Sequence, residues 1–334
     1  MTRSGFLRIL LTLLACAGLG TTALALMAGR IGVPAAERAE LLASLGTLAC
    51  FLAPMALLAS DEIVTGLRRL VDGRPMTTFA IAGALVLPYL LYWTVAAGSS
   101  AGGLARILIY AGLATGAGLA PSPKRFPWSG DLLLVLVLWL PLELGALSRS
   151  FPWPSGGAGR ILAGPLALDL LLFLVLVVRK DDGLGYSFRF RGRDVATAVA
   201  AFAVFLVAGV PLGRLTGFIG PPHLPGHPLD VPLTFVAIFL FTGIQEESLF
   251  RGLIQRSLER WVRRPGLALV IASLVFGAAH LNNGPSPNWR YGFLATIAGL
   301  AYGWTYRRTG RLSAAGLTHA LVDTTWSAIF KGRG

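Results

Sequence analysis

The sequence predicts an all-α polytopic membrane protein, a transmembrane helix bundle of about 11 spans. Composition is the first observation: 54% of the 334 residues are hydrophobic and 13% are charged, about half the charged share of a soluble protein. Long apolar runs are the second observation, since they recur along the whole chain. The runs are continuous rather than alternating, so they favour helices over a β-barrel, the other fold that satisfies its backbone groups inside a bilayer.

Each expected helix is an apolar run bounded by polar, proline-rich or glycine-rich residues. The first six are expected at 6–28, 39–59, 77–97, 101–120, 131–148 and 161–178. A polar segment at 179–194 divides the chain into an N-terminal region, residues 1–194, and a C-terminal region, residues 195–334. The last five helices are expected at 195–213, 231–255, 266–281, 291–306 and 312–330, with a proline-rich loop at 217–230. The run at 266–281 is the shortest and is marginal for a full crossing.

Basic residues are distributed unevenly over the loops between these runs, and this bias predicts the orientation of the chain. With the N-terminus in the cytoplasm, the inner loops hold 19 lysines and arginines and the outer loops hold 8. Cytoplasmic loops of membrane proteins collect positive charge in this way. Topology therefore explains the net charge of +13, and no nucleic-acid partner is expected. The arginine, alanine and leucine bias indicates a bacterial source, so we expect a protein of the bacterial inner (cytoplasmic) membrane.

Ionisable residues inside the expected helices gather in the last third of the chain, where burial in lipid makes them costly unless they pair or function. In "EESLFR", Glu247 and Arg251 are four residues apart, which predicts an ion pair on one helix face. Glu246 is turned about 100° from Glu247 and has no such partner. A carboxylate left unpaired in this way is suited to act as a general base. The alternative is a buried ion pair that only fixes helix packing.

Two further helices each contribute a short motif with the same four-residue spacing. Phe276 and His280 share one face, and His319 and Asp323 share another. If Arg264-Pro265-Gly266 turns an antiparallel hairpin, Glu246 and His280 lie nearly level along its axis. We therefore expect a carboxylate, two imidazoles and a second carboxylate to meet at one depth in the membrane.

Such a cluster can support hydrolysis by two routes. Glu246, His280, His319 and Asp323 form a plausible ligand set for Zn²⁺. Alternatively, Glu246 activates water directly, His280 polarises that water or stabilises the oxyanion, and His319 with Asp323 completes the pocket. The H-E-x-x-H zinc motif is absent from the sequence, which favours the metal-free route. No cofactor is therefore expected, with Zn²⁺ as the alternative.

Taken together, the three motifs resemble those of the CPBP family of intramembrane proteases, which includes the type II CAAX prenyl endopeptidases and bacterial Abi-type relatives. The motifs are Glu246-Glu247-Ser-Leu-Phe-Arg251, Phe276-Gly-Ala-Ala-His280 and His319-Ala-Leu-Val-Asp323. The resemblance covers residues 195–330 and implies that 195–334 is an intramembrane protease domain. It further implies an endopeptidase that acts on a membrane-anchored protein or peptide.

The resemblance also implies roles for individual residues. Glu246 would activate water with His280, His319 and Asp323 around it, while Glu247, Arg251 and Phe276 would support the site. Position 323 departs from the pattern, because the prenyl endopeptidases carry asparagine there. The resemblance therefore leaves open whether a prenylated substrate is used.

Two other function classes fit the same ionisable cluster. One is a non-catalytic membrane scaffold or immunity-type protein that keeps the fold, and the other is a proton-coupled transporter. In the N-terminal region, whose role the sequence does not indicate, Glu143 and Asp169 are expected to be structural. They would line a polar interior or reach Arg106.

Overall fold

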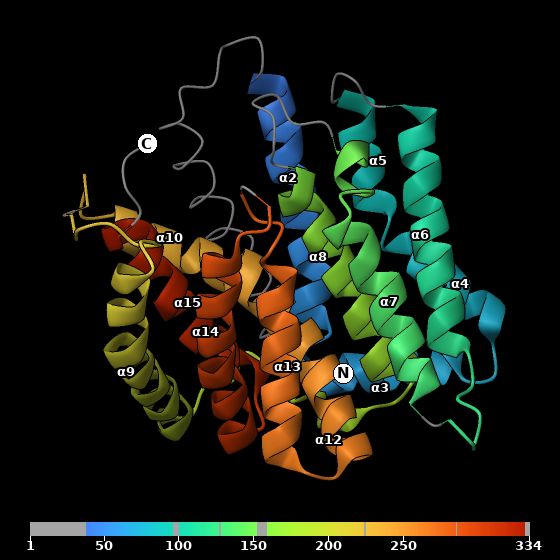
Figure 1. The fold of residues 1–334 in the computed structure, drawn as a ribbon. Coiled ribbons are helices and arrows are strands. Elements are labelled where there is room, and N and C mark those ends of the chain that lie inside the picture. The colour runs from blue at the N-terminus through green and yellow to red at the C-terminus, as the bar shows by residue number, and fades with distance from the viewer. Residues whose placement is uncertain are drawn as a thin grey trace. The chain divides into compact units, whose positions relative to one another are not determined.

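A computed structural model describes residues 38–95, 100–126, 128–151, 159–223, 225–284 and 286–330. These residues form helices joined by turns and loops and include no strand, which confirms the all-α prediction for this part of the chain (Figure 1). The helix expected at 6–28 lies outside the described residues. The chain forms two compact units, Met1–Asp182 and Gly183–Gly334. The boundary between them falls within the polar segment 179–194.

Membrane-spanning character is evident in both units. Within the described ranges, helical segments long and apolar enough to cross a bilayer are Pro75–Thr94, Ala101–Leu119, Gly192–Leu215 and Asp230–Val262. Ser44–Leu57 and Asp61–Val71 would add a fifth if this pair, bent by 90°, is counted as one span. Leu162–Val178 and Pro265–Ala279 are apolar but shorter. The chain is thus a membrane protein, and the count of about 11 spans stays a prediction.

The N-terminal unit consists of short helices, several of them broken within an expected span. Its elements are α2 (Arg38–Leu57), α3 (Asp61–Val71), α4 (Pro75–Ala84), α5 (Leu87–Val95), α6 (Ala101–Leu119), α7 (Ser129–Glu143), η2 (Ser148–Ser150), α8 (Gly159–Leu172) and η3 (Phe173–Val178). The single helix expected at 77–97 is interrupted between α4 and α5, where Pro88 cannot donate a helical hydrogen bond. The inner loop expected after residue 59 instead contains helix α3. Acidic residues in its first turn and basic residues in its last turn suit the helix dipole.

Asp169 is the acidic residue of helix α8 in the N-terminal unit. Its side chain is fully buried in α8, and neither carboxylate oxygen has a hydrogen-bond partner. Arg106 does not reach it; this arginine donates to Ser150 Oγ at 3.1 Å and to the Arg149 carbonyl at 3.3 Å. Of the two alternatives for Asp169, the one in which it reaches Arg106 is therefore wrong.

The C-terminal unit carries all the motifs singled out in the sequence. After the turn η4 (Asp182–Leu184) come α9 (Gly192–Leu215), α10 (Asp230–Ile238), η5 (Phe239–Gly243), α11 (Ile244–Glu247), η6 (Ser248–Gln255), α12 (Arg256–Val262), α13 (Pro265–Ala279), α14 (Trp289–Thr309), α15 (Leu312–Thr325) and η7 (Trp326–Phe330). The expected turn at residue 264 is present, with Arg264 as N-cap and Pro265 at the first position of α13. Helix α14 ends at Gly310, whose positive φ of 65° suits glycine.

The helix expected at 231–255 is present within the continuous helical segment Asp230–Val262. Its winding changes along its length, because η5 and η6 are wide π-type turns on either side of the four-residue helix α11. Close packing accompanies the first of them: a Cβ on Gly243 would stand 3.0 Å from the Gly316 carbonyl oxygen on α15. Wide turns of this kind occur often at functional sites, because they redirect the side chains that follow.

Helices α13 and α14 pack so closely that only glycine fits at several contact points. A Cβ on Gly277 would overlap Thr296 and would stand 2.5 Å from the Gly292 carbonyl oxygen. A Cβ on Gly299 would stand 3.3 Å from the Phe276 ring. These contacts hold the Phe276-x-x-x-His280 motif against the middle of α14.

Candidate active site

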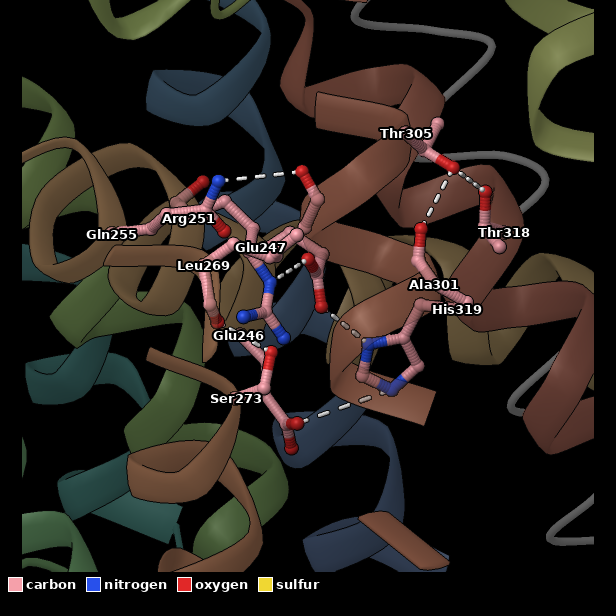
Figure 2. Close-up of polar contacts among 12 residues, drawn as sticks. Glu246, Glu247, Arg251, Gln255, Leu269, Ser273, Ala301, Thr305, Thr318 and His319 are labelled. Carbon is pink, nitrogen blue, oxygen red and sulfur yellow. Dashed lines mark hydrogen bonds and ion pairs between the residues drawn. The ribbon is translucent and has the colours of Figure 1, made fainter. Parts of the chain in front are cut away.

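The three sequence motifs meet inside the C-terminal unit. Glu246 and Glu247 lie on α11, His280 caps the C-terminus of α13, and His319 and Asp323 lie on α15. His319 is the hub of the cluster, because both glutamates and Asp323 approach its ring nitrogens. Figure 2 shows Arg251, Glu247 and His319 in a row, with the Glu247 carboxylate between the Arg251 guanidinium and the His319 imidazole.

A buried relay runs from Arg251 through Glu247 to His319. Arg251 Nε donates to Glu247 Oε2 at 2.9 Å, which confirms the ion pair predicted from the spacing of four. Glu247 Oε1 is 2.9 Å from His319 Nδ1. Both partners of the ion pair are 0% exposed. Because a carboxylate paired with arginine only accepts, His319 Nδ1 must carry the proton that it shares with Glu247.

The second nitrogen of His319 faces the two remaining carboxylates. His319 Nε2 is 3.3 Å from Asp323 Oδ2 and 3.9 Å from Glu246 Oε2. The Glu246 side chain is 28% exposed, yet its Oε2 atom is buried and has no hydrogen-bond partner. Glu246 thus presents an unsatisfied acceptor oxygen beside His319, whereas Glu247 is fully engaged.

His280 joins the site through a shared cavity. Its Nδ1 is 2.8 Å from the Phe276 carbonyl oxygen, which can only accept, so this nitrogen donates and Nε2 is left for other partners. His280, His319 and Asp323 line one cavity. Glu246 lies within electrostatic range of both histidines. The structure therefore brings together the four residues that the sequence selected, with His280, His319 and Asp323 on one cavity and Glu246 beside His319.

Aromatic and aliphatic side chains form most of the cavity wall, contributed by α9, α14, α15 and η7. Phe218, Tyr291 and Trp326 stand together on one side, with ring centroids 5.1–5.7 Å apart. The same Tyr291 ring contacts His280, with centroids 4.8 Å apart, so this aromatic group adjoins an ionisable residue of the site. The cavity is therefore suited to apolar groups next to ionisable side chains.

Phe276 packs between His280 and the buried Arg251. Its ring stands at 4.9 Å from Phe250 and 4.5 Å from His280, and the Arg251 guanidinium lies 5.0 Å from its centroid. Phe276 lines the cavity, whereas Arg251 does not. The Phe276 ring therefore covers the Arg251 guanidinium and separates it from the cavity. This position agrees with the supporting role expected for Phe276.

Sequence reasoning missed two tyrosines on α14. Tyr302 stacks on His319 with centroids 4.6 Å apart and ring planes at 16°, and Tyr291 meets the His280 ring edge-on at 4.8 Å. The two positions are 11 residues apart, which places them on one helix face after about three turns. The spacing of 11 residues could have predicted that the two tyrosines share a face. It does not predict a role for them, because the sequence does not show which residues that face of α14 contacts.

The Zn²⁺ alternative requires several ligand side chains close to one point. Among the residues that the structure describes, no group of three or more His, Cys, Asp or Glu side chains is placed to hold a metal ion. The Nδ1 atoms of both histidines are engaged, and a zinc-binding histidine commonly engages one ring nitrogen in this way while the other binds the metal. The choice between the zinc route and the metal-free route therefore stays a prediction.

Comparison with known families identifies the same part of the chain. Residues 228–325 match the family model described as "Type II CAAX prenyl endopeptidase Rce1-like". The resemblance to the CPBP family is thereby confirmed. The matched range contains all three motifs and covers less than a third of the chain. Searches of curated proteins and of solved structures found no match. Similarity to this family supports protease activity in general and agrees with the apolar helices.

Proposed function

We propose that this protein is an intramembrane endopeptidase that hydrolyses a peptide bond of a membrane-anchored protein or peptide, with Glu246 as the base that activates water. The family match supports the protease class. The observation that carries the choice of Glu246 is its buried Oε2 atom, which lacks a hydrogen-bond partner and lies 3.9 Å from His319 Nε2. A carboxylate oxygen in that condition is the natural acceptor for a proton from water.

The proposed reaction uses one water molecule. Glu246 takes a proton from the water. At the same time the water oxygen bonds to the carbonyl carbon of the substrate, and the carbonyl π electrons move to the carbonyl oxygen. The resulting oxyanion is stabilised by the Nε2–H of His280 or of His319, which each ring carries in its imidazolium form because its Nδ1–H is already donated. Collapse of the intermediate breaks the C–N bond, and the proton on Glu246 passes to the leaving amine. The products are a new carboxyl terminus and a new amino terminus.

The supporting residues prepare the two imidazoles for this role. Glu247, held by Arg251, fixes the His319 proton on Nδ1, and the Phe276 carbonyl does the same for His280. Both rings therefore turn their Nε2 atoms to other partners. Fixing the tautomer and orientation of a catalytic histidine by a second acceptor is how many hydrolases keep the imidazole ready to react.

The location of the site indicates where the substrate would come from. Glu246 and Glu247 lie within the apolar helical segment Asp230–Val262, and the cavity beside them is mostly apolar. A substrate held in the lipid would reach such a site without crossing a polar barrier. In the orientation proposed from the loop charges, the N-terminus is cytoplasmic in a bacterial inner membrane.

A comparison of membrane proteomes would test this proposal. Cells that express the wild-type protein or Glu246→Gln are compared for new protein termini, with Glu259→Gln as a matched control. Glu259 is a glutamate on the adjoining helix α12 that pairs with Arg307 at 3.7 Å. We expect a set of termini that is lost in Glu246→Gln and kept in Glu259→Gln, at equal protein abundance.

Identical termini in all three strains would overturn the proposal. A cellular phenotype that survives Glu246→Gln would then indicate a scaffold. Loss of solute flux without any change in termini would instead indicate a transporter.

A further inference from the structure

We propose that Tyr302 is a positioning residue for the site, whose ring holds the plane of the His319 imidazole while its hydroxyl holds the Asp323 carboxylate. The inference deepens the proposed function, because it concerns the residues that would carry it. It assigns a role to α14, a helix that contributes none of the residues selected from the sequence.

The stacking contact is the first observation. The Tyr302 and His319 rings are nearly parallel, at 16°, with centroids 4.6 Å apart, and Tyr302 is only 1% exposed. A buried ring stacked at this distance prevents the imidazole from rotating out of its plane. Phe276 meets the same imidazole edge-on at 6.0 Å. Glu247 fixes the Nδ1 edge, so the Nε2 edge is the side that remains directed at Glu246 and Asp323.

The hydroxyl group is the second observation. Tyr302 Oη is 3.5 Å from Asp323 Oδ1, while Asp323 Oδ2 is 3.3 Å from His319 Nε2. The two oxygens of one carboxylate thus face two different partners. A tyrosine hydroxyl in a fully buried position needs a hydrogen-bond partner, since leaving it without one is costly. A core that required only an aromatic ring here would be served by phenylalanine.

The packing of the two helices maintains this geometry. Thr305 Oγ1 on α14 and Thr318 Oγ1 on α15 are 3.1 Å apart (Figure 2). Thr318 directly precedes His319, and Thr305 lies one turn beyond Tyr302. The threonine pair therefore fixes the relative position of the two helices next to the stacked rings. Tyr302 is consequently held on a rigid element rather than on a loop, as a positioning group requires.

The kinetic test compares three variants on one substrate, a membrane protein found by the proteome comparison. Tyr302→Phe keeps the ring and removes the hydroxyl, and Tyr302→Leu removes both. Tyr306→Phe is the matched control: Tyr306 lies one turn away on α14, is buried, and donates to the Leu184 carbonyl at 3.1 Å, away from His319. We expect kcat to fall a few-fold, and by about tenfold at most, for Tyr302→Phe, because the 3.5 Å contact is long for a hydrogen bond. We expect it to fall about 100-fold for Tyr302→Leu, with KM unchanged in both and kcat unchanged in the control.

A second readout needs no substrate. The chain has four histidines, so a protein labelled with ¹⁵N-histidine gives a sparse imidazole spectrum in which loss of a signal in His319→Gln identifies that residue. We expect the His319 ring signals to move and broaden in Tyr302→Leu and to stay near their wild-type positions in Tyr302→Phe and Tyr306→Phe.

Two results would overturn the inference: unchanged His319 signals and kcat in Tyr302→Leu, or an equal fall of kcat in Tyr306→Phe. If Tyr302→Leu does not fold, the two phenylalanine variants decide. A fall of kcat in Tyr302→Phe but not in Tyr306→Phe supports the inference, and equal values of kcat overturn it. If the wild-type protein cleaves nothing, the proposed function fails, and the imidazole spectra still decide whether Tyr302 positions His319.

Discussion

Removal of the buried ion pair between Glu247 and Arg251 should separate stability from activity. Both side chains are 0% exposed, and Arg251 Nη1 and Nη2 have no hydrogen-bond partner, so the guanidinium relies on Glu247. Glu247→Leu leaves that cation buried and uncompensated, and Arg251→Met leaves the carboxylate with His319 alone. We expect each single variant to lower the free energy of unfolding by about 3–5 kcal/mol.

The double variant Glu247→Leu/Arg251→Met should recover most of that loss. It replaces both charges with apolar groups of similar volume, and such replacements are often neutral or stabilising. The coupling free energy in this double-mutant cycle should therefore approach the summed losses of the two single variants, about 6–10 kcal/mol, less the loss that the double variant retains. Activity should not recover, because His319 Nδ1 has lost the acceptor at 2.9 Å that fixes its proton. Removing the acid that orients a catalytic histidine costs about 10⁴-fold in serine proteases, so we expect a loss of at least about 100-fold.

The assay is equilibrium unfolding in detergent micelles, followed by tryptophan fluorescence, with cleavage rates measured on the same preparations. The Lys180–Asp72 pair, at 2.6 Å, provides a control, since its side chains are 49% and 68% exposed. The hydrogen bond from Lys180 lowers the pKa of Asp72, but solvent screens the pair, so Lys180→Met should change stability little. Strictly additive losses in the double variant, or restored cleavage, would refute the relay from Arg251 to His319.

Three further predictions follow from the geometry. Gly277→Ala should destabilise the protein by about 1–3 kcal/mol because its Cβ would overlap Thr296, whereas Gly266→Ala on the same helix meets nothing and should be neutral or stabilising in thermal unfolding. Asp323→Asn should keep the cleavage rate within about tenfold of wild type, since its amide oxygen still accepts from His319 Nε2. Asp323→Leu has no acceptor at this position and should lower the cleavage rate further in the same assay. Cleavage should persist after treatment with EDTA and 1,10-phenanthroline, because the proposed route uses Glu246 and water without a metal; inhibition that added Zn²⁺ reverses would contradict this.

The parts of the site that lie within one helix were predictable from the sequence. Helical periodicity alone places Glu247 beside Arg251 and His319 beside Asp323, and the structure has both contacts. The wide turns on either side of α11 do not disturb the Glu247–Arg251 contact. Local geometry therefore determined these two pairs before any helix was packed against another.

Contacts between helices were not predictable in the same way. The bond from Glu247 to His319 and the stack of Tyr302 on His319 depend on the axial rotation of three helices. That rotation follows from close approaches such as Gly243 against Gly316, and sequence spacing does not report which glycines face each other. In the N-terminal unit, by contrast, Pro88 is a local signal for the interruption of the helix expected at 77–97.

The central claim is that the Glu246 carboxylate activates the hydrolytic water. The most direct measurement is cleavage of a proteome-identified substrate by purified protein in lipid vesicles, comparing wild type with Glu246→Gln under single-turnover conditions. We predict that Glu246→Gln binds the substrate normally and lowers the rate of bond cleavage by about 10³-fold or more. A Glu246→Gln rate within a few-fold of wild type, at equal folding and equal substrate binding, would contradict the claim.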